Sequence, residues 1–545
     1  MEENVKQTQD VFAENCGKIY GGIINVGILC VLLVFPLYYH DYYYDMLESK
    51  YRCYYMIMLT MFAAVALISI AFFVVDTLEF QLRHTKELLR KFSPREIRKT
   101  MTLMDWCLLA FLAAGVISTL QSDYLFESFW GNEGRYTGLF LHLIYGAGFF
   151  LISRLYRFKN WHGYAFLAVA MLPLLFGITD FFQMDLLKFK EEISSQDMND
   201  YTSTFGNINT YATYIGIVFG CISALWIREK TGWKAALLYL GYLVCVVAMV
   251  MGNSDNVVFG VAVVFAFLPL AAFRNKQGIE RYILLLSGFA MGIWLTGLAS
   301  RLAPDRALPL HGFFGALTRF SGIIFLAAAG VLVAVVLHYF RLKSKPQEED
   351  LGNRYVKLWG IFLVLCVAAG IYLLYDANIA GHSERYGALG SYLKFSDEWG
   401  TYRGMIWRIT LEAYAKQPLR HKIWGFGLDT FGVMTYAYRG ETSRICGQVY
   451  DSAHNEYLQY LVTLGPVGLA AYIAFLASSL KTILKSRLNR EWGLAIAFGV
   501  GCYLAQAFVT INLPIVTPIM WMLLSMGVAG CGRSQASDEE ERALD

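Results

Sequence analysis

The sequence predicts an all-α polytopic membrane protein with about 12–14 transmembrane helices and a large, partly helical external loop. Apolar side chains make up 56% of the 545 residues, and charged side chains only 16%. Soluble domains carry about a quarter of charged residues, so the apolar excess is expected to face lipid. The hydrophobic runs are each close to the roughly 20 residues that a helix needs to cross a hydrocarbon layer.

Fourteen such runs follow one another along the chain. The pair on either side of Gly252–Asn256 could instead form a re-entrant hairpin, which would leave twelve spans and keep every other loop on its side. No cleavable signal sequence is expected before the first run, because residues 1–18 are polar and mixed in charge. The runs lie at 19–39, 53–75, 102–120, 137–153, 163–182, 207–227, 235–251, 257–273, 282–299, 322–340, 358–375, 457–480, 492–510 and 514–531.

The runs divide the chain into four parts. We expect a transmembrane region at 1–375, a large external loop at 376–456, C-terminal transmembrane helices at 457–531 and an acidic cytoplasmic tail at 532–545. The loop is too long to be a plain connection, since structureless loops beyond about 15 residues are uncommon. It is expected to form two or three short helices that cover the outer surface. One of them should bury the face made by Ile406, Trp407, Thr410, Leu411 and Tyr414, which are apolar or small at helical spacing.

The distribution of Lys and Arg predicts the orientation. Well over half of the 46 basic residues fall in connections that are inner if the N-terminus is inside. This asymmetry is typical of cytoplasmic loops, so both termini are expected to be cytoplasmic. The basic segment Arg83–Lys99 could be an amphipathic helix on anionic lipid or a solvated inner loop. The net charge of +3 averages two compartments and gives no support for a nucleic-acid partner.

Metal and redox sites are not indicated. The ten cysteines are scattered, with no Cys-x-x-Cys pair and no Cys/His pair at the spacing of metal ligands. No Asp-x-Asp occurs in the chain, so a divalent metal is not implied. We therefore expect no cofactor.

Polar side chains gather in three connections that the alternation of spans places on the outer side. Each residue could instead have a structural role, since arginine can cap a turn and Asn is a favoured N-cap. His454 is expected in the first turn of its helix, after the possible caps Asp451 and Ser452. The candidates are Arg135 in 130–138, Asn207 and Asn209 in 204–212, and Arg403, Arg408 and His454 in the large loop.

Three motifs resemble one family in the same order. Thr204–Ala212 resembles its Gly-Thr-Phe-Gly-Asn-Pro-Asn-x-x-Ala signature. Arg403–Trp407, followed by Pro418 and Gly425–Gly427, resembles its Arg-x-x-x-Trp and Pro-Leu-x-Gly-x-Gly stretch. His454–Leu458 resembles its His-Asn-x-Tyr-Leu helix. Together these segments resemble the O-antigen ligase and O-antigen polymerase superfamily, around a large outer loop in the matching place.

The resemblance implies a metal-independent, inverting glycosyltransferase in the plasma membrane of a bacterium. It would move a glycan from an undecaprenyl-diphosphate carrier to an acceptor hydroxyl on a glycan, lipid or protein, in contact with membrane lipid. Arg403 would be catalytic at the diphosphate, because its planar fork binds phosphate oxygens. His454 would be catalytic as the base, since the ordinary histidine pKa is about 6.5. The implied substrate-binding residues are Arg135, Arg408, Asn207, Asn209 and Asn455.

One turn departs from the family pattern. Many relatives carry Ser-Arg in a short outer turn, whereas Met251–Asn256 places Asp255 where a second phosphate-binding arginine is expected. The residue that supplies the second cationic contact to the phosphate is therefore undecided. It could be Arg135, Arg408 or one of Arg301, Arg306 and Arg319.

The reaction itself also stays open at this point. A ligase hands the glycan to a different acceptor, and a polymerase hands it to another lipid-linked repeat. The alternatives from other classes are a lipid-linked-oligosaccharide flippase or transporter, and a non-catalytic protein that binds the carrier. Transporters tend to place binding residues near the bilayer midplane. Here the polar clusters lie at one interface.

Overall fold

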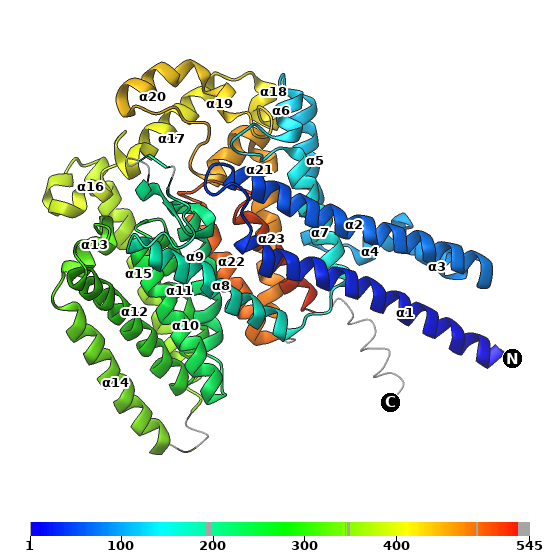
Figure 1. Cartoon of the computed structure of the whole chain (residues 1–545), viewed down its shortest axis with the longest axis horizontal. Helices are drawn as coiled ribbons and strands as arrows, with labels where there is room; N and C mark the ends of the chain where they lie inside the picture. The colour runs from blue at the N-terminus through cyan, green and yellow to red at the C-terminus, as the bar shows by residue number, and fades with distance from the viewer. Residues whose placement is uncertain are drawn as a thin grey trace.

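The computed structural model describes residues 2–191, 193–194, 198–343, 345, 349–486 and 489–531, and the arrangement is almost wholly helical (Figure 1). One antiparallel ribbon joins β1 (Tyr201–Thr202) to β2 (Gly206–Asn207), with Tyr201 opposite Asn207. The helices of the membrane region are α1 (Glu2–Leu29), α2 (Met46–Glu79), α3 (Arg83–Lys91), α4 (Pro94–Thr100), α5 (Leu103–Leu120), α6 (Leu125–Trp130), α7 (Leu139–Leu155), α8 (Asn160–Phe181), α9 (Ile208–Trp226), α10 (Gly232–Met251), α11 (Val257–Ala272), α12 (Lys276–Leu302), α13 (Gly312–Arg319), α14 (Ile323–Lys343), α15 (Arg354–Asn378), α21 (Glu456–Lys485), α22 (Arg490–Gln506) and α23 (Thr517–Ala529).

Each of the fourteen predicted runs lies over one helix. Ten helical segments in the described part are long and apolar enough to cross a membrane. The shorter apolar helices α7, α11 and α23, together with α22, account for the other four runs. The all-α polytopic fold predicted from the sequence is therefore confirmed.

The end of the first run is broken in a way that the sequence analysis did not predict. After α1 the chain forms a π-helical turn, Cys30–Val34, and a 3-10 turn, Phe35–Leu37. The buried ammonium of Lys50 donates to the carbonyl oxygens of Phe35 and Pro36 at 2.9 and 3.2 Å. Thr204 Oγ1 donates to the same Pro36 oxygen at 2.7 Å. These bonds satisfy carbonyls that the broken helix leaves free, and they tie the loop after α1 to the 204–212 segment.

The basic segment forms two helices, so a single amphipathic helix over Arg83–Lys99 is wrong. α3 ends at Lys91, and α4 begins at Pro94. Ser93 caps α4, since its side chain accepts a hydrogen bond from the backbone N–H of Glu96. Proline suits the first position of a helix but cannot continue one from before it.

The centre of the bundle is the pair α9 and α22, which pack closely along their length. Small residues permit this contact: a Cβ on Gly220 would come within 2.6 Å of the Phe498 carbonyl oxygen, and one on Gly499 within 2.5 Å of Cys221 Sγ. Such distances are too short for real atoms, so only glycine fits. The close contact brings the start of α9 next to the residues that follow α22.

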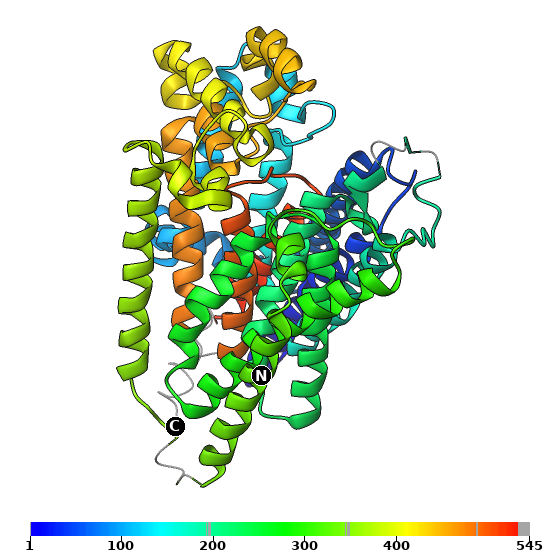
Figure 2. The ribbon, with the colours of Figure 1, turned by 90° about the vertical axis from the view of Figure 1, so that its left-hand side faces the viewer.

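Residues 379–455, between α15 and α21, form a helical cap, called the lid below. It contains more helices than the two or three predicted, because several of them are a single turn. They are α16 (Gly390–Leu393), α17 (Trp399–Lys416), α18 (Leu419–Trp424), α19 (Phe431–Met434) and α20 (Arg439–Cys446), with 3-10 turns at Ser383–Leu389 and Tyr436–Tyr438. α17 to α20 gather at one end of the molecule, and α14 runs to the other end (Figure 1, Figure 2).

The lid has a small core of its own. Ile406, Ala413, Phe431, Met434 and Ala453 are buried there, against aromatic side chains that include Trp407 and Tyr414. The predicted inner face of α17 is therefore present, but Leu411 is 51% exposed and does not belong to it.

Candidate active site

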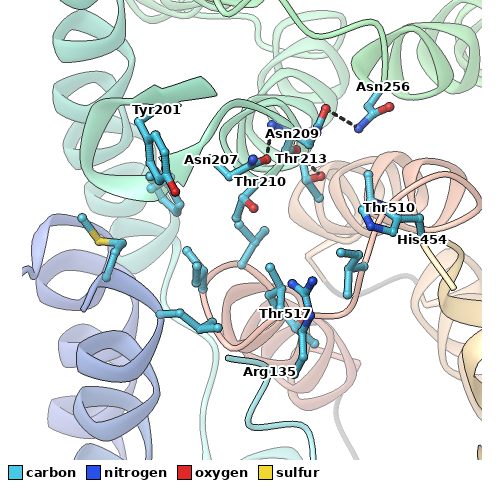
Figure 3. A pocket seen from close by; sticks show the side chains of 18 of the residues that line it. Arg135, Tyr201, Asn207, Asn209, Thr210, Thr213, Asn256, His454, Thr510 and Thr517 are labelled. Atoms are coloured by element: carbon cyan, nitrogen blue, oxygen red, sulfur yellow. Dashed lines mark hydrogen bonds between the residues drawn. The ribbon is translucent and has the colours of Figure 1, made fainter. Parts of the chain in front are cut away.

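Six connections that the sequence places on one side meet around a cavity of about 360 Å³. Figure 3 shows Arg135 and His454 approaching this cavity from different elements, with Asn207 and Asn209 opposite them. Ligand pockets commonly have volumes of 300–1,000 Å³. The lining comes from the connections at 40–52, 121–136, 183–206, 252–256, 376–456 and 511–513 and from the helix ends beside them.

His454 lies just before its helix, so its expected place in the first turn is wrong. α21 begins at Glu456, and the cap is Asn455, whose side chain accepts from the backbone N–H of Leu458. His454 has a φ of +47°, an uncommon conformation for a residue other than glycine. Its ring packs edge-on against Tyr450 with centroids 5.6 Å apart. Neither ring nitrogen has a hydrogen-bond partner among the described residues, so one can serve as a proton acceptor.

The electrostatic surroundings hold His454 in its neutral form. Burial, together with the positive charges of Arg135 and Arg403, lowers the pKa of His454 to about 3. Both arginines line the same cavity. At neutral pH the ring therefore keeps a free lone pair between two cations.

Arg403 is held by neutral oxygens. Three residues before it, Gly400 to Tyr402, have φ values of about 60°, so the regular part of α17 starts at Arg403. Arg403 Nε donates to the carbonyl oxygen of Val509 at 2.9 Å, and Nη1 donates to that of Gly400 at 2.6 Å. Nη2 lies 3.4 Å from Asn256 Oδ1. No carboxylate in the described ranges pairs with Arg403, so its charge is left for a ligand.

Arg135 has a carboxylate partner. Its Nε donates to Asp451 Oδ1 at 2.9 Å, and Nη2 donates to the same oxygen. The side chain of Arg135 is 21% exposed. An anion in the cavity would compete with Asp451 for this guanidinium, so Arg135 is a weaker free cation than Arg403.

A second cavity of about 1,070 Å³ lies beside the first, under the lid. Arg403, Asn256 and Val509 line both cavities. Residues 383–401 of the lid and Phe313 supply much of the remaining wall. Arg403 is thus part of the wall between the smaller cavity and the larger one.

Residues 307–473 match the family model described as O-antigen ligase. This match covers less than a third of the 545 residues and supports membership of the O-antigen ligase and polymerase superfamily. The matched range contains the lid with Arg403 and His454 and the start of α21, whereas Arg135 and 204–212 lie outside it. No curated protein and no solved structure matches the chain.

Both asparagines of the 204–212 segment line the first cavity, and both have structural partners. Asn207 caps α9 and accepts from the Asn209 backbone N–H at 2.8 Å. Asn209 Oδ1 accepts from Ser254 Oγ and Asn256 Nδ2, each at 2.8 Å. Asn256 therefore connects Asn209 to Arg403. The sequence analysis did not single out Asn256, although it follows directly on the Asp255 position that departs from the superfamily pattern.

Asp255 has a structural explanation. Its carboxylate accepts from the backbone N–H of Phe313 at 3.0 Å and lies against the start of α13. Carboxylates stabilise helix N-termini. Burial raises the pKa of Asp255, and these backbone N–H groups oppose that rise. An acidic residue at this turn thus fixes α13, where the family resemblance predicts arginine.

Two predicted substrate-binding residues lie elsewhere. Arg408 pairs with Asp397, Glu412 and Glu441 at 2.7–3.0 Å and lines a separate cavity together with Asn455. Three carboxylates occupy its donors, which raises the pKa of Arg408 and leaves little charge for a phosphate. Of the candidates for the second cationic contact, only Arg135 lines a cavity shared with His454. Arg301, Arg306 and Arg319 line neither of the two cavities above, within the described chain.

Asp429 is a further residue that the sequence analysis missed. It is 5% exposed, and its Oδ2 accepts from the backbone N–H groups of Asn132 and Thr137 at 2.7 and 2.9 Å. Burial raises the pKa of Asp429 to about 7, against the effect of these bonds and of Arg135. Asp429 thereby fastens the loop that carries Arg135 to the lid. Its partners are distant backbone groups, so no local sequence signal marks it.

Proposed function

We propose that this chain is an O-antigen-ligase-type glycosyltransferase that moves a glycan from an undecaprenyl-diphosphate carrier to an acceptor hydroxyl at the outer face of a bacterial plasma membrane. The observation that carries the proposal is that His454 lines one cavity together with Arg135 and Arg403. Such a transfer needs a proton acceptor and positive charge at one place. The lid faces outward in this proposal, and both termini are cytoplasmic.

The proposed reaction has one bond exchange. The acceptor oxygen bonds to the anomeric carbon of the glycan while the bond from that carbon to the phosphate oxygen breaks, with inversion. The hydroxyl proton passes to the free nitrogen of His454, and the electron pair leaves with the lipid diphosphate. Arg403 and Arg135 stabilise the charge on this leaving group.

Donor binding would also adjust the base. The diphosphate is negative and would offset the two arginine charges that help to lower the pKa of His454. The pKa should therefore rise from about 3 in the free protein toward its ordinary value when donor is bound. His454 becomes a better proton acceptor only when a donor is present.

The two cavities suggest how the substrates divide. The diphosphate belongs beside Arg403 and Arg135 in the smaller cavity, and the larger one under the lid has room for the sugars. In the described part of the chain, no group of three or more His, Cys, Asp or Glu side chains could hold a metal ion. Transfer without a metal is part of the proposal.

The first experiment tests the role of His454 in purified protein. His454→Ala should keep donor binding while turnover falls by roughly 10²- to 10⁴-fold, the usual loss of a general base. His382→Ala is the matched control, because His382 also lies in the lid but lines neither cavity. Full activity of His454→Ala per folded molecule would make the carrier-binding or transport alternatives the better ones.

The second experiment separates ligase from polymerase. Purified protein receives labelled lipid-linked donor alone, and then donor with a separate acceptor. A ligase gives product only in the second mixture. A polymerase lengthens the lipid-linked glycan in the first mixture, and that result would replace the ligase proposal.

A further inference from the structure

A second site lies at the far end of the bundle from the candidate active site. A cavity of about 460 Å³ is lined by Arg228, Arg274 and Arg490, with walls from α11, α21 and α22. α22 has 17 residues, and Arg490 begins it, whereas the residues after its other end line the first cavity. At 1.5 Å per residue the two sites are about 25 Å apart. This cavity is therefore separate from the proposed catalytic centre.

The three arginines have no carboxylate partner. None of them forms an ion pair within the described ranges, and no Asp or Glu among those residues lines the cavity. Burial lowers the pKa of Arg228, and repulsion from Arg490 and Arg274 lowers it further, with only Glu491 acting in the other direction. Cations that repel one another around one cavity are stabilised by an anion that enters it.

The other walls of the cavity are apolar. Leu270, Ile483 and Leu494 line it, as do Phe267 and Leu484, which are 52% and 55% exposed. Large exposed apolar side chains at this position open the cavity to the hydrocarbon around the bundle. The lining thus combines a positive end, built from connections between helices, with an apolar side along them.

We propose that this cavity binds an anionic phospholipid of the cytoplasmic leaflet, with the phosphate among Arg228, Arg274 and Arg490 and an acyl chain along Phe267 and Leu484. Basic pockets between transmembrane helices on the cytoplasmic side suit such headgroups. Arginine binds phosphate oxygens through its planar fork. The site is independent of the transfer reaction and rests on the inward orientation of these connections.

The test uses the full chain purified in detergent. Native mass spectrometry measures the bound lipid, and the melting temperature measures its effect on stability. Phosphatidylglycerol should bind saturably and raise the melting temperature, and phosphatidylcholine should bind at least tenfold more weakly. Arg228→Gln, Arg274→Gln and Arg490→Gln should each weaken phosphatidylglycerol binding about fivefold, the effect of one basic residue near an anionic surface.

The matched control is Lys230→Gln. Lys230 is exposed, two residues after Arg228, and does not line the cavity, so the same loss of charge should leave binding unchanged. If a glutamine variant folds poorly, Arg228→Lys replaces it. This variant keeps the charge but loses the fork, so its binding should lie between that of wild type and that expected for Arg228→Gln. Equal binding of both phospholipids, or an equal loss with Lys230→Gln, would overturn the proposal.

Two further probes identify the source of the phosphate. Inorganic phosphate at millimolar concentration should not displace phosphatidylglycerol, because it lacks the acyl chain. Displacement by inorganic phosphate would assign the cavity to a free anion instead. Tighter binding of a polyprenyl phosphate than of phosphatidylglycerol would assign it to the carrier lipid, and either result overturns the phospholipid site.

Discussion

We predict that kcat/KM stays constant at acidic pH values at which an ordinary histidine base would already be protonated and inactive. kcat/KM reports the ionisation of the free enzyme, in which burial and the charges of Arg135 and Arg403 lower the pKa of His454 to about 3. An unperturbed histidine would give an acid limb near pH 6.5. We therefore expect a flat kcat/KM between about pH 5 and 7, where an ordinary base would lose most of its activity.

The magnitude of the effect follows from the same pKa. One pKa unit corresponds to about 1.4 kcal/mol, so a shift from 6.5 to about 3 means that the surroundings disfavour the imidazolium by roughly 5 kcal/mol. Arg135→Gln or Arg403→Gln removes one repelling charge and should raise the pKa of His454. Burial is the largest cause, so each substitution should recover only part of the shift. With donor bound, the diphosphate offsets the arginines, and the acid limb of kcat should lie above that of kcat/KM.

The effect on stability has a defined sign. The folded-state pKa of His454 is below the unfolded value, so the unfolded state binds the proton more readily between about pH 6.5 and 3. The folded state is therefore not penalised by His454 above about pH 6.5, and the free energy of unfolding decreases as the pH falls below that value. Wild-type protein should therefore lose up to about 1.4 kcal/mol of stability per pH unit on acidification through His454, and His454→Ala should remove this part of the fall in melting temperature.

The assay measures initial rates from pH 4.5 to 7.5 at donor concentrations below and above KM, with melting temperature on the same preparations. His382→Ala serves as the control for removal of a lid histidine. An acid limb of kcat/KM near pH 6.5 that Arg135→Gln leaves in place would refute the reasoning. In that case His454 would be either an ordinary exposed histidine or not the base.

Other predictions concern orientation, metal and two of the side chains. Cysteine labels at Glu384 should report the outer side and labels at Arg90 the cytoplasmic side; labelling from one side would break the site assembly. Transfer in detergent should persist after exhaustive chelation, and activity restored by Mg²⁺ would count against the arginine-based mechanism. Arg403→Lys keeps the charge but loses the fork, so donor binding should weaken by about 10- to 100-fold with partial turnover, whereas Arg444→Lys in α20 of the lid should behave as wild type. Asp429→Asn keeps an acceptor for both backbone N–H groups and should retain activity. Asp429→Ala lacks this acceptor, so the loop that carries Arg135 should be displaced and donor affinity should fall. Equal activity of the two variants would show that Asp429 does not support the site.

The helices could be predicted from the sequence because their signal is local. Apolar runs of transmembrane length are visible in any window, and each of them lies over a helix in the structure. The break at Phe35–Leu37 was missed, since it depends on Lys50 and Thr204 from other parts of the chain. Partners far apart in sequence leave no pattern in either segment.

The two arginines of α17 could have been separated from the sequence alone. Arg403 and Arg408 are five positions apart, so on a helix of 3.6 residues per turn their side chains point about 140° apart. The two side chains therefore cannot both point into the cavity that His454 lines. Arg403 points into it, and Arg408 turns toward Asp397 and Glu441. Helical spacing thus separates the two. The choice of Arg135 as the second cation required the fold, because 121–136 meets the lid only in space.

The two cavity arginines differ in how they are held, and this difference suggests how the free site would change when a diphosphate binds. Arg403 is oriented by the carbonyl oxygens of Gly400 and Val509, which fix a guanidinium without neutralising it. Arg135 is oriented by Asp451, so its charge is offset until an anion competes. A diphosphate would therefore meet Arg403 first and gain Arg135 only by displacing Asp451. That displacement would leave the Asp451 carboxylate near His454, where a negative charge favours the imidazolium that proton transfer creates.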